Sequence, residues 1–234
     1  MIFTKIPIFI TVRGHNAEEI IKNKECLKFS YVFIKEQNLF NQTFIISDNI
    51  NIINYAKDLG FKHTIHYACR SERDIKYLEY LATYTYSIEN NYHPDWIILL
   101  NVNQLFKNSS LLYDCIRNID SKYDVIASYT EISNKNKFYI NKENNKIING
   151  QNKSSLLSND IIREKMIDAA IYAVRTEFAF SCMEYEDPSI KFWSGKFKFF
   201  KNKTLYTDIY SIKDIQKFYN IRKVLDAVNE IIAI

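Results

Sequence analysis

Short, continuously apolar runs alternate along this chain with stretches in which apolar residues recur at helical spacing. The runs expected to form strands span residues 7–12, 43–46, 61–66, 95–100, 124–129, 167–174 and 196–200. The stretches expected to form helices span 27–37, 50–60, 71–90 and 109–119, and a last one begins at about Ser211. Strands that are apolar on both faces and alternate with helices are typical of a mostly parallel sheet covered on both sides. The pattern therefore predicts an α/β fold, a three-layer α/β/α sandwich.

Local chemistry predicts where some of these helices begin and end. Asp48 stands where an N-cap is expected, and Ser109 holds the corresponding position before a later helix. Short side chains that accept a hydrogen bond from the first turn are favoured at such positions. Gly60 follows the last apolar residue of its helix, and glycine readily adopts the left-handed conformation of a C-cap.

A polar segment interrupts the alternation at about 134–160, where the chain is rich in Asn, Lys and Ser and a small hairpin is expected over 138–148. Long loops within compact domains are more often functional than idle. We expect this segment to be an insertion or flap in one domain that spans residues 1–234.

Composition narrows the class of protein. The chain has 234 residues, 47% of them hydrophobic, with only 4 Gly and 3 Pro, which argues against disorder and against a turn-rich sandwich. A net charge of +4 is spread along the chain, so no nucleic-acid partner is expected. Cys26, Cys69, Cys115 and Cys182 lack disulfide-framework or zinc spacing. No stretch is long enough to span a bilayer. A cytoplasmic protein is expected.

The first candidate for chemistry is the loop after the first strand, where Arg13-Gly14 is followed by Lys22-Asn23. A cationic loop with a glycine at the carboxyl end of a strand can present charge and backbone N–H groups to a phosphate. The alternative is an ordinary solvated loop, because a single glycine is a weak signal. Of the histidines only His15, which lies in this loop, is a candidate for a role.

Several motifs together resemble one enzyme family. The segment from Val12 to Asn23 keeps the Arg, Gly, Lys and Asn of the family's strand-loop motif Ala-Arg-Gly-Gly-Ser-Lys-Gly-Ile-Pro-x-Lys-Asn, but lacks its internal Lys, second Gly and Pro. Further matches are Ile46-Ser47-Asp48, Arg70, the stretch from Leu100 to Lys107, Asp168-Ala169-Ala170-Ile171-Tyr172, and Asp208-Ile209-Tyr210-Ser211-Ile212-Lys213-Asp214. The chain resembles a divergent member of the cytidylyltransferases that activate acidic sugars (sialic acid, pseudaminic acid, Kdo) with CTP.

The resemblance implies a Rossmann-like nucleotidyltransferase (nucleotide-diphospho-sugar transferase) fold and the transfer of CMP from CTP to a sialic-acid-like sugar for surface polysaccharide synthesis. It implies catalytic roles for Arg13, Lys22 and Asp208, nucleotide binding by Arg13, Gly14, Asn23 and Arg70, acceptor binding by Asn101, Asn103 and Gln104, and Mg²⁺ binding by Asp208. It also makes the polar insertion a lid or the contact of a homodimer.

Departures from the family pattern leave alternatives open. Tyr210 replaces the second Asp of the metal motif, and Asp168 is a candidate substitute carboxylate. Turn chemistry alone explains the amides after Leu100, and a helix N-terminus alone explains Asp208. The rival functions are a degenerate homologue that binds a nucleotide or a partner without turnover, and a nucleotide-sugar glycosyltransferase.

Overall fold

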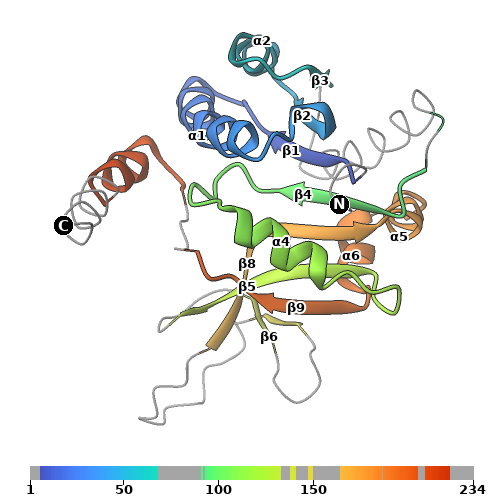
Figure 1. Cartoon of the computed structure of the whole chain (residues 1–234). Helices are drawn as coiled ribbons and strands as arrows, with labels where there is room; N and C mark the ends of the chain where they lie inside the picture. The colour runs from blue at the N-terminus through green and yellow to red at the C-terminus, as the bar shows by residue number, and fades with distance from the viewer. Residues whose placement is uncertain are drawn as a thin grey trace, which may run out of the picture.

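The computed structural model describes residues 6–67, 91, 93–132, 138–140, 147–149, 164–185, 187–204 and 209–221. Its strands are β1 (Ile8–Val12), β2 (Thr43–Ser47), β3 (His63–His66), β4 (Trp96–Leu100), β5 (Val125–Ile132), β6 (Phe138–Ile140), β7 (Ile147–Asn149), β8 (Glu164–Arg175) and β9 (Phe197–Lys201). Its helices are α1 (Ala17–Glu36), a short 3-10 helix (Phe40–Gln42), α2 (Ile50–Leu59), α4 (Ser109–Arg117), α5 (Thr176–Met183), α6 (Pro188–Trp193) and a last one over 212–221. Figure 1 shows their arrangement.

The strands join in one sheet in the order β3-β2-β1-β4-β8-β5-β9. The pairs β1–β2, β1–β4, β2–β3 and β5–β9 are parallel. Strand β8 is antiparallel to both of its neighbours, β4 and β5. The parallel half of the sheet, from β3 to β4, confirms the predicted alternation of strand and helix, and β8 adds an antiparallel insertion to the predicted mostly parallel sheet.

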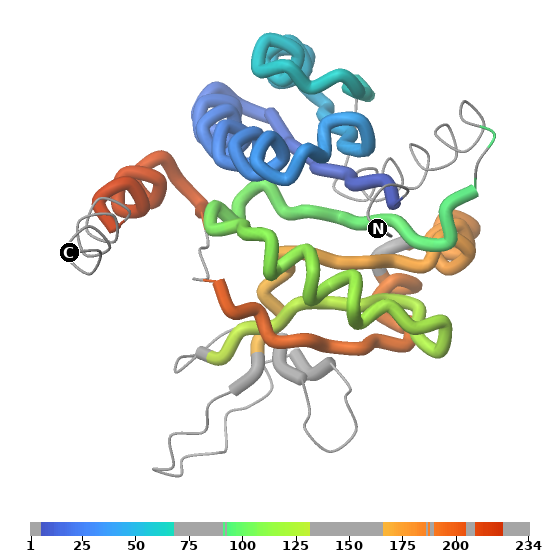
Figure 2. The backbone as a smooth tube through the Cα atoms, viewed as in Figure 1, coloured from blue at the N-terminus to red at the C-terminus, as the bar shows by residue number. Residues whose placement is uncertain are grey.

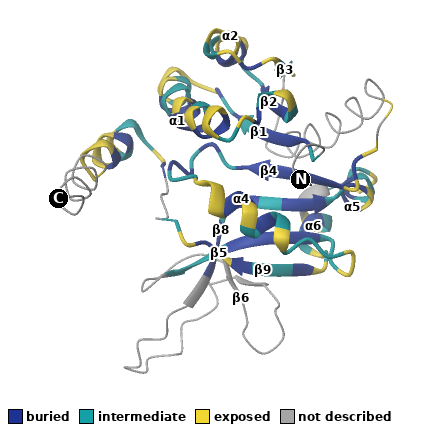
Figure 3. Cartoon of the chain, in the orientation of Figure 1, coloured by how far each residue is buried: buried dark blue, intermediate teal, exposed yellow. Residues whose placement is uncertain are grey.

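Two hydrophobic clusters on opposite faces of the sheet confirm the three-layer sandwich. Alternate residues of β1 divide between them: Ile8 and Ile10 belong to one cluster and Phe9 to the other. The first cluster takes residues from α1, α2, α4 and the helix over 212–221, and the second takes residues from α5 and α6. Figure 3 shows the resulting pattern, with buried strands between helices whose outer sides are exposed.

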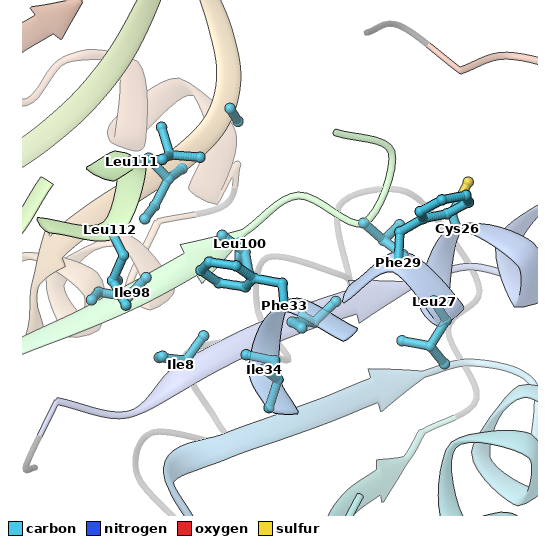
Figure 4. Close-up of a cluster of buried hydrophobic side chains, with 14 of the residues drawn as sticks. Ile8, Cys26, Leu27, Phe29, Phe33, Ile34, Ile98, Leu100, Leu111 and Leu112 are labelled. Atoms are coloured by element: carbon cyan, nitrogen blue, oxygen red, sulfur yellow. The ribbon is translucent and has the colours of Figure 1, made fainter. Parts of the chain in front are cut away.

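Helix α1 covers β1 and β4. Phe33 points toward Ile98 and Leu100 in the close-up of the first cluster (Figure 4), whereas the Phe29 ring packs against Phe218. The sequence predicted this helix only from residue 27. It begins at Ala17 instead, ten residues earlier. The apolar pattern missed the first turns because polar residues lie on their buried side.

Two predicted caps are wrong by one residue. Asn49, not Asp48, caps α2, since its side chain accepts a hydrogen bond from the Asn51 N–H. Asn108, not Ser109, caps α4 in the same way. Gly60 ends α2 as predicted, with φ of 102°.

The hairpin predicted within the polar insertion is confirmed, because β6 and β7 pair antiparallel and Tyr139 of β6 is also paired with Met166 of β8. Helices α5 and α6 were not predicted. The helix predicted over 71–90 lies outside the described residues. Three cysteines of the described part, Cys26, Cys115 and Cys182, are buried and form no disulfide. Within that part, no helix combines the length and the hydropathy that a membrane span requires.

Candidate functional site

The loop from β1 to α1 is fixed by the residues that follow the neighbouring strand β2. The Gly14 N–H donates to Asp48 Oδ1 at 2.9 Å, and Asn49 Nδ2 donates to the Gly14 carbonyl at 2.8 Å. Because β1 and β2 are parallel neighbours, their carboxyl ends lie at the same edge of the sheet and their loops meet there. Asp48, predicted as a helix cap, is therefore part of the loop structure.

Two side chains close the start of α1. Asn16 Oδ1 accepts a hydrogen bond from the Glu19 N–H at 2.9 Å, and Glu19 Oε2 accepts one from the His15 N–H at 2.8 Å. This arrangement is a variant of the capping box, because Glu19 bonds the N–H of the residue before the N-cap Asn16. The His15 ring lies between the Arg13 guanidinium, which contacts Nε2, and Asp48 Oδ2, which is 3.6 Å from Nδ1. The backbone N–H groups of both Gly14 and His15 are thus held by carboxylates.

Lys22 and Asn23 lie in α1 and are buried, 8% and 2% exposed, so the solvated turn that we left open is wrong. Asn23 Nδ2 donates to the Arg13 carbonyl at 2.7 Å, which ties the loop to the helix. Asn23 Oδ1 is buried and receives no hydrogen bond from a described residue. Lys22 forms no ion pair with a described carboxylate. The α1 face thus offers a buried cation and an open acceptor close to the loop.

The turn after β4 supplies the other predicted residues. Asn101 Oδ1 accepts from the Asn103 N–H at 2.9 Å, which is the turn chemistry we considered as an alternative to acceptor binding. Gln104 is 1% exposed, and its Nε2 faces Thr204 Oγ1 at 3.4 Å and the Phe106 carbonyl at 3.3 Å. Gln104 therefore points into the protein, whereas Asn101 and Asn103 are half-buried. The turn is the green segment that leads from β4 into α4 in Figure 2.

Lys107 fastens this turn to α1. Its Nζ donates to Ser30 Oγ at 3.2 Å and to the Gln104 carbonyl. Ser30 and Cys26 are one helical turn apart on one face of α1. Burial raises the pKa of the Cys26 thiol, and the nearby Lys107 and Lys22 act in the opposite direction. Burial of the ammonium outweighs the nearby thiol and lowers the pKa of Lys107 to about 7.

This lysine makes stability depend on pH. Between about pH 7 and 9 the unfolded chain keeps the Lys107 proton and the native chain releases it, so the free energy of unfolding should rise with pH, by up to about 1.4 kcal/mol per unit. The Cys26 thiol, whose pKa burial raises to about 11, opposes this only above pH 9. Urea unfolding at pH 6.5–8.5 should show the rise in the wild type and its absence in Lys107→Met. Lys62→Met, on an exposed residue, should keep it; equal slopes in all three proteins would contradict the prediction.

A buried polar network continues from Gln104 into the second half of the sheet. Thr204 Oγ1 donates to Asn202 Oδ1 at 2.7 Å, and Asn202 Nδ2 donates to Asp168 Oδ2 at 2.8 Å. Asp168 Oδ1 accepts from the Ala170 N–H at 3.0 Å and from Ser128 Oγ. A bulge in the β5–β8 pairing, with a φ of 53° at Ala169, turns the carboxylate inward. The network links the turn after β4 to the segment that leads toward 205–208.

Asp168 does not fit the role of substitute metal ligand. Asp168 is 4% exposed, and both of its carboxylate oxygens accept hydrogen bonds from the protein. Burial raises the pKa of Asp168, and the bonds from Ser128, Ala170 and Asn202 act in the opposite direction. Asp214, the last residue of the metal-like motif, accepts hydrogen bonds from the backbone and hydroxyl of Ser211 and so caps the helix over 212–221.

Arg70 and Asp208 lie outside the described residues, so their roles stay predictions. Within the described residues, no three His, Cys, Asp or Glu side chains form a group that could hold a metal ion. The Mg²⁺ site predicted at Asp208 also stays a prediction.

The sequence analysis missed Glu19, Asn202 and Thr204. It matched Lys107 to a cation of the family motif by charge alone. The Asn16-x-x-Glu19 spacing is the signal that could have found Glu19, since it is a capping-box pattern. Asn202 and Thr204 carry no local signal, because their partners Asp168 and Gln104 are remote in sequence.

Comparison with known proteins shows which fold this is. No family model matches the chain, and no curated protein matches its sequence. The chain is similar in structure to CMP:2-keto-3-deoxy-manno-octonic acid synthetase complexed with CTP, with a TM-score of 0.68 and 11% identity, over 94% of this chain and 99% of that one. It is also similar to 4-diphosphocytidyl-2C-methyl-D-erythritol synthase from Anaerococcus prevotii, with a TM-score of 0.56 and 12% identity over 90% and 94%.

A third similar structure is HddC from Yersinia pseudotuberculosis complexed with GMP-PN, with a TM-score of 0.57 and 12% identity over 91% of this chain and 97% of that one. At these identities the likeness establishes the fold. The chain shares the three-layer α/β/α sandwich of these proteins, as predicted.

Proposed function

We propose that this chain transfers CMP from CTP to an acidic, sialic-acid-like sugar and releases pyrophosphate, with Mg²⁺ as cofactor, for surface polysaccharide synthesis. The observation that carries the proposal is the meeting of the β1–α1 loop and the turn after β4 at the carboxyl ends of two adjacent parallel strands. Ligands of open α/β sheets bind at this edge. Two similar structures have names that denote cytidylyl enzymes, and one of them is complexed with CTP.

In the proposed reaction the sugar hydroxyl oxygen forms a bond to the α-phosphorus, the bond between the α-phosphorus and its bridging oxygen breaks, and the hydroxyl proton goes to solvent. Such a transfer depends on placing the reactants and balancing the phosphate charge. Arg13 would hold phosphate oxygens as a fork and Lys22 as a point charge. Asn23 would read the nucleotide through its open Oδ1 while its Nδ2 keeps the Arg13 backbone in place.

Mg²⁺, bound through Asp208 and the phosphates, would neutralise charge that develops on the leaving group. On the acceptor side, the half-buried Asn101 and Asn103 are better placed to meet a sugar than Gln104, whose amide is turned into the protein. A homodimer and a cytoplasmic location stay predictions of the sequence.

Two observations favour a second candidate, a homologue that binds a nucleotide without turnover. The two loop N–H groups that a phosphate would use are bonded to Asp48 and Glu19. Glu18 and Glu19 also place negative charge in the first turn of α1, where the family motif has Gly and Ile after its internal Lys. Both features weaken the attraction for a triphosphate.

The experiment that separates the candidates is calorimetric titration with CTP and Mg²⁺, followed by a pyrophosphate-release assay with a panel of acidic sugars. Binding together with release that EDTA abolishes supports the transferase. Tight binding without release from any sugar supports the binding homologue. A thermal shift with a nucleotide-sugar but none with CTP would point to the glycosyltransferase and would refute the proposal.

Arg13→Ala should weaken CTP binding by about 1.5–3 kcal/mol, the range for hydrogen bonds to charged groups. Calorimetric titration measures the loss. Arg117→Ala is the matched control, since Arg117 is exposed at the end of α4 remote from the loop, and it should bind CTP as the wild type does. Equal affinity of the Arg13 variant and the wild type would show that the loop is not the phosphate site.

A further inference from the structure

The first turn of α1 carries a carboxylate, that of Glu19, which bonds a backbone N–H at the start of the helix. The Glu19 carboxylate reaches back over the turn and accepts the His15 N–H at 2.8 Å, although Glu19 is only half-buried. Backbone N–H groups at a helix start attract any anion that can reach them, whether a carboxylate or a phosphate. Glu19 therefore takes a position that suits a phosphate oxygen.

The two carboxylates at the loop differ in how firmly they are held. The Asp48 side chain is 6% exposed, and it lies between the Gly14 N–H and the His15 ring. Asn49 binds the opposite side of the loop through the Gly14 carbonyl. Asp48 is thus built into the loop, whereas Glu19 has one hydrogen bond to it and access to solvent. A ligand can displace Glu19 without opening the fold.

Displacement has an electrostatic cost even when the side chain moves. The Glu19 carboxylate is attached to the first turn and stays within a few ångströms of a phosphate bound there, where like charges repel. Glu18 carries the same charge in the same turn but is exposed, so that solvent and salt screen it more strongly. The two neighbours form a natural pair for comparison.

We propose that the Glu19 carboxylate occupies the phosphate position at the start of α1 and lowers the affinity of this loop for the triphosphate of the substrate. The inference rests on the proposed function for the identity of the ligand, but not for the anion position itself. Glu19 is in this sense a residue that sets specificity, because it penalises the most highly charged part of a nucleotide.

Calorimetric titration of the full chain at fixed ionic strength tests the proposal, with Glu19→Gln and Glu18→Gln as matched variants and with CTP and inorganic tripolyphosphate as probes. Glutamine keeps the acceptor for the His15 N–H and removes the charge, so the fold is retained, which a thermal melt checks. Glu19→Gln should bind both probes about tenfold more tightly than the wild type. Glu18→Gln should change the affinity by less than about threefold.

Equal shifts in the two variants, or no shift in Glu19→Gln, would overturn the proposal. Tighter tripolyphosphate binding by Glu19→Gln without any CTP binding would uphold the anion position and reject the proposed function. Should Glu19→Gln melt well below the wild type, Glu19→Ser, whose short side chain cannot reach the His15 N–H, takes its place with the same expectation.

Discussion

Asp168→Ala is expected to lower the free energy of unfolding by about 4 kcal/mol. The substitution removes the acceptor of two buried donors, Asn202 Nδ2 and the Ala170 N–H, and each unsatisfied buried group costs about 1–3 kcal/mol. Ser128 loses less, because its hydroxyl also faces the Ile171 backbone. Urea unfolding followed by circular dichroism measures the change.

The matched control is Ser128→Ala, which removes one hydrogen bond to Asp168, leaves the other two and takes the hydroxyl acceptor from the Ile171 N–H; a loss of about 2 kcal/mol is expected. Asp168→Asn should fall between the two, since it keeps the shape and one accepting oxygen. An Asp168→Ala protein within about 1 kcal/mol of the wild type would show that the network does not stabilise the fold.

Asp168→Ala should also affect the candidate site. Asn202 holds Thr204 at 2.7 Å, and Thr204 faces Gln104 in the turn after β4. Loss of Asp168 frees Asn202 to move, and the turn that carries Asn101 and Asn103 loses its support on that side. In the proposed enzyme, where CTP would bind mainly against α1, Asp168→Ala would therefore raise the KM for the acceptor more than the KM for CTP.

The strands of the parallel half could be predicted because their residues are buried on both faces. All five residues of β2 and of β4 are buried, so an unbroken apolar run describes β4 fully and the centre of β2, between Thr43 and Ser47. The start of α1 could not be predicted in this way. Lys22, Asn23 and Ser30 lie on the buried side of the helix, and a rule that places polar residues in solvent reads those turns as a loop.

The candidate site was predictable only as far as it is local. Arg13, Gly14, Lys22 and Asn23 form a short segment with a family pattern, and the structure brings them to one loop and helix. The inward turn of Asp168 depends on a bulge at Ala169 and on partners from β5 and the segment after β9. These contacts cannot be predicted from sequence spacing, because they form only when strands that are distant in the sequence pair in the sheet.

Gly14→Ala is expected to damage both the fold and the candidate site. A Cβ on Gly14 would lie 2.6 Å from Asn49 Cβ and 2.9 Å from Ile52 Cδ1. The Ile52 methyl can rotate away, but Asn49 Cβ is fixed by the backbone at the start of α2. We expect a loss of about 3 kcal/mol in the free energy of unfolding, the upper end of the cost of overpacking, and weaker CTP binding because Asn49 moves away from the Gly14 carbonyl.

A double-mutant cycle with Asn49→Gly tests whether this contact is the cause. Asn49→Gly removes the obstructing Cβ, so the double variant should lose clearly less stability than the sum of the two single losses. Gly60→Ala is the comparison for a glycine without a clash: a Cβ there meets nothing within 4 Å, but φ is +102°, and about 1–2 kcal/mol is expected from backbone strain alone. Additive losses in the cycle, measured by urea unfolding, would show that the close approach of α2 to the loop is not what requires a glycine at position 14.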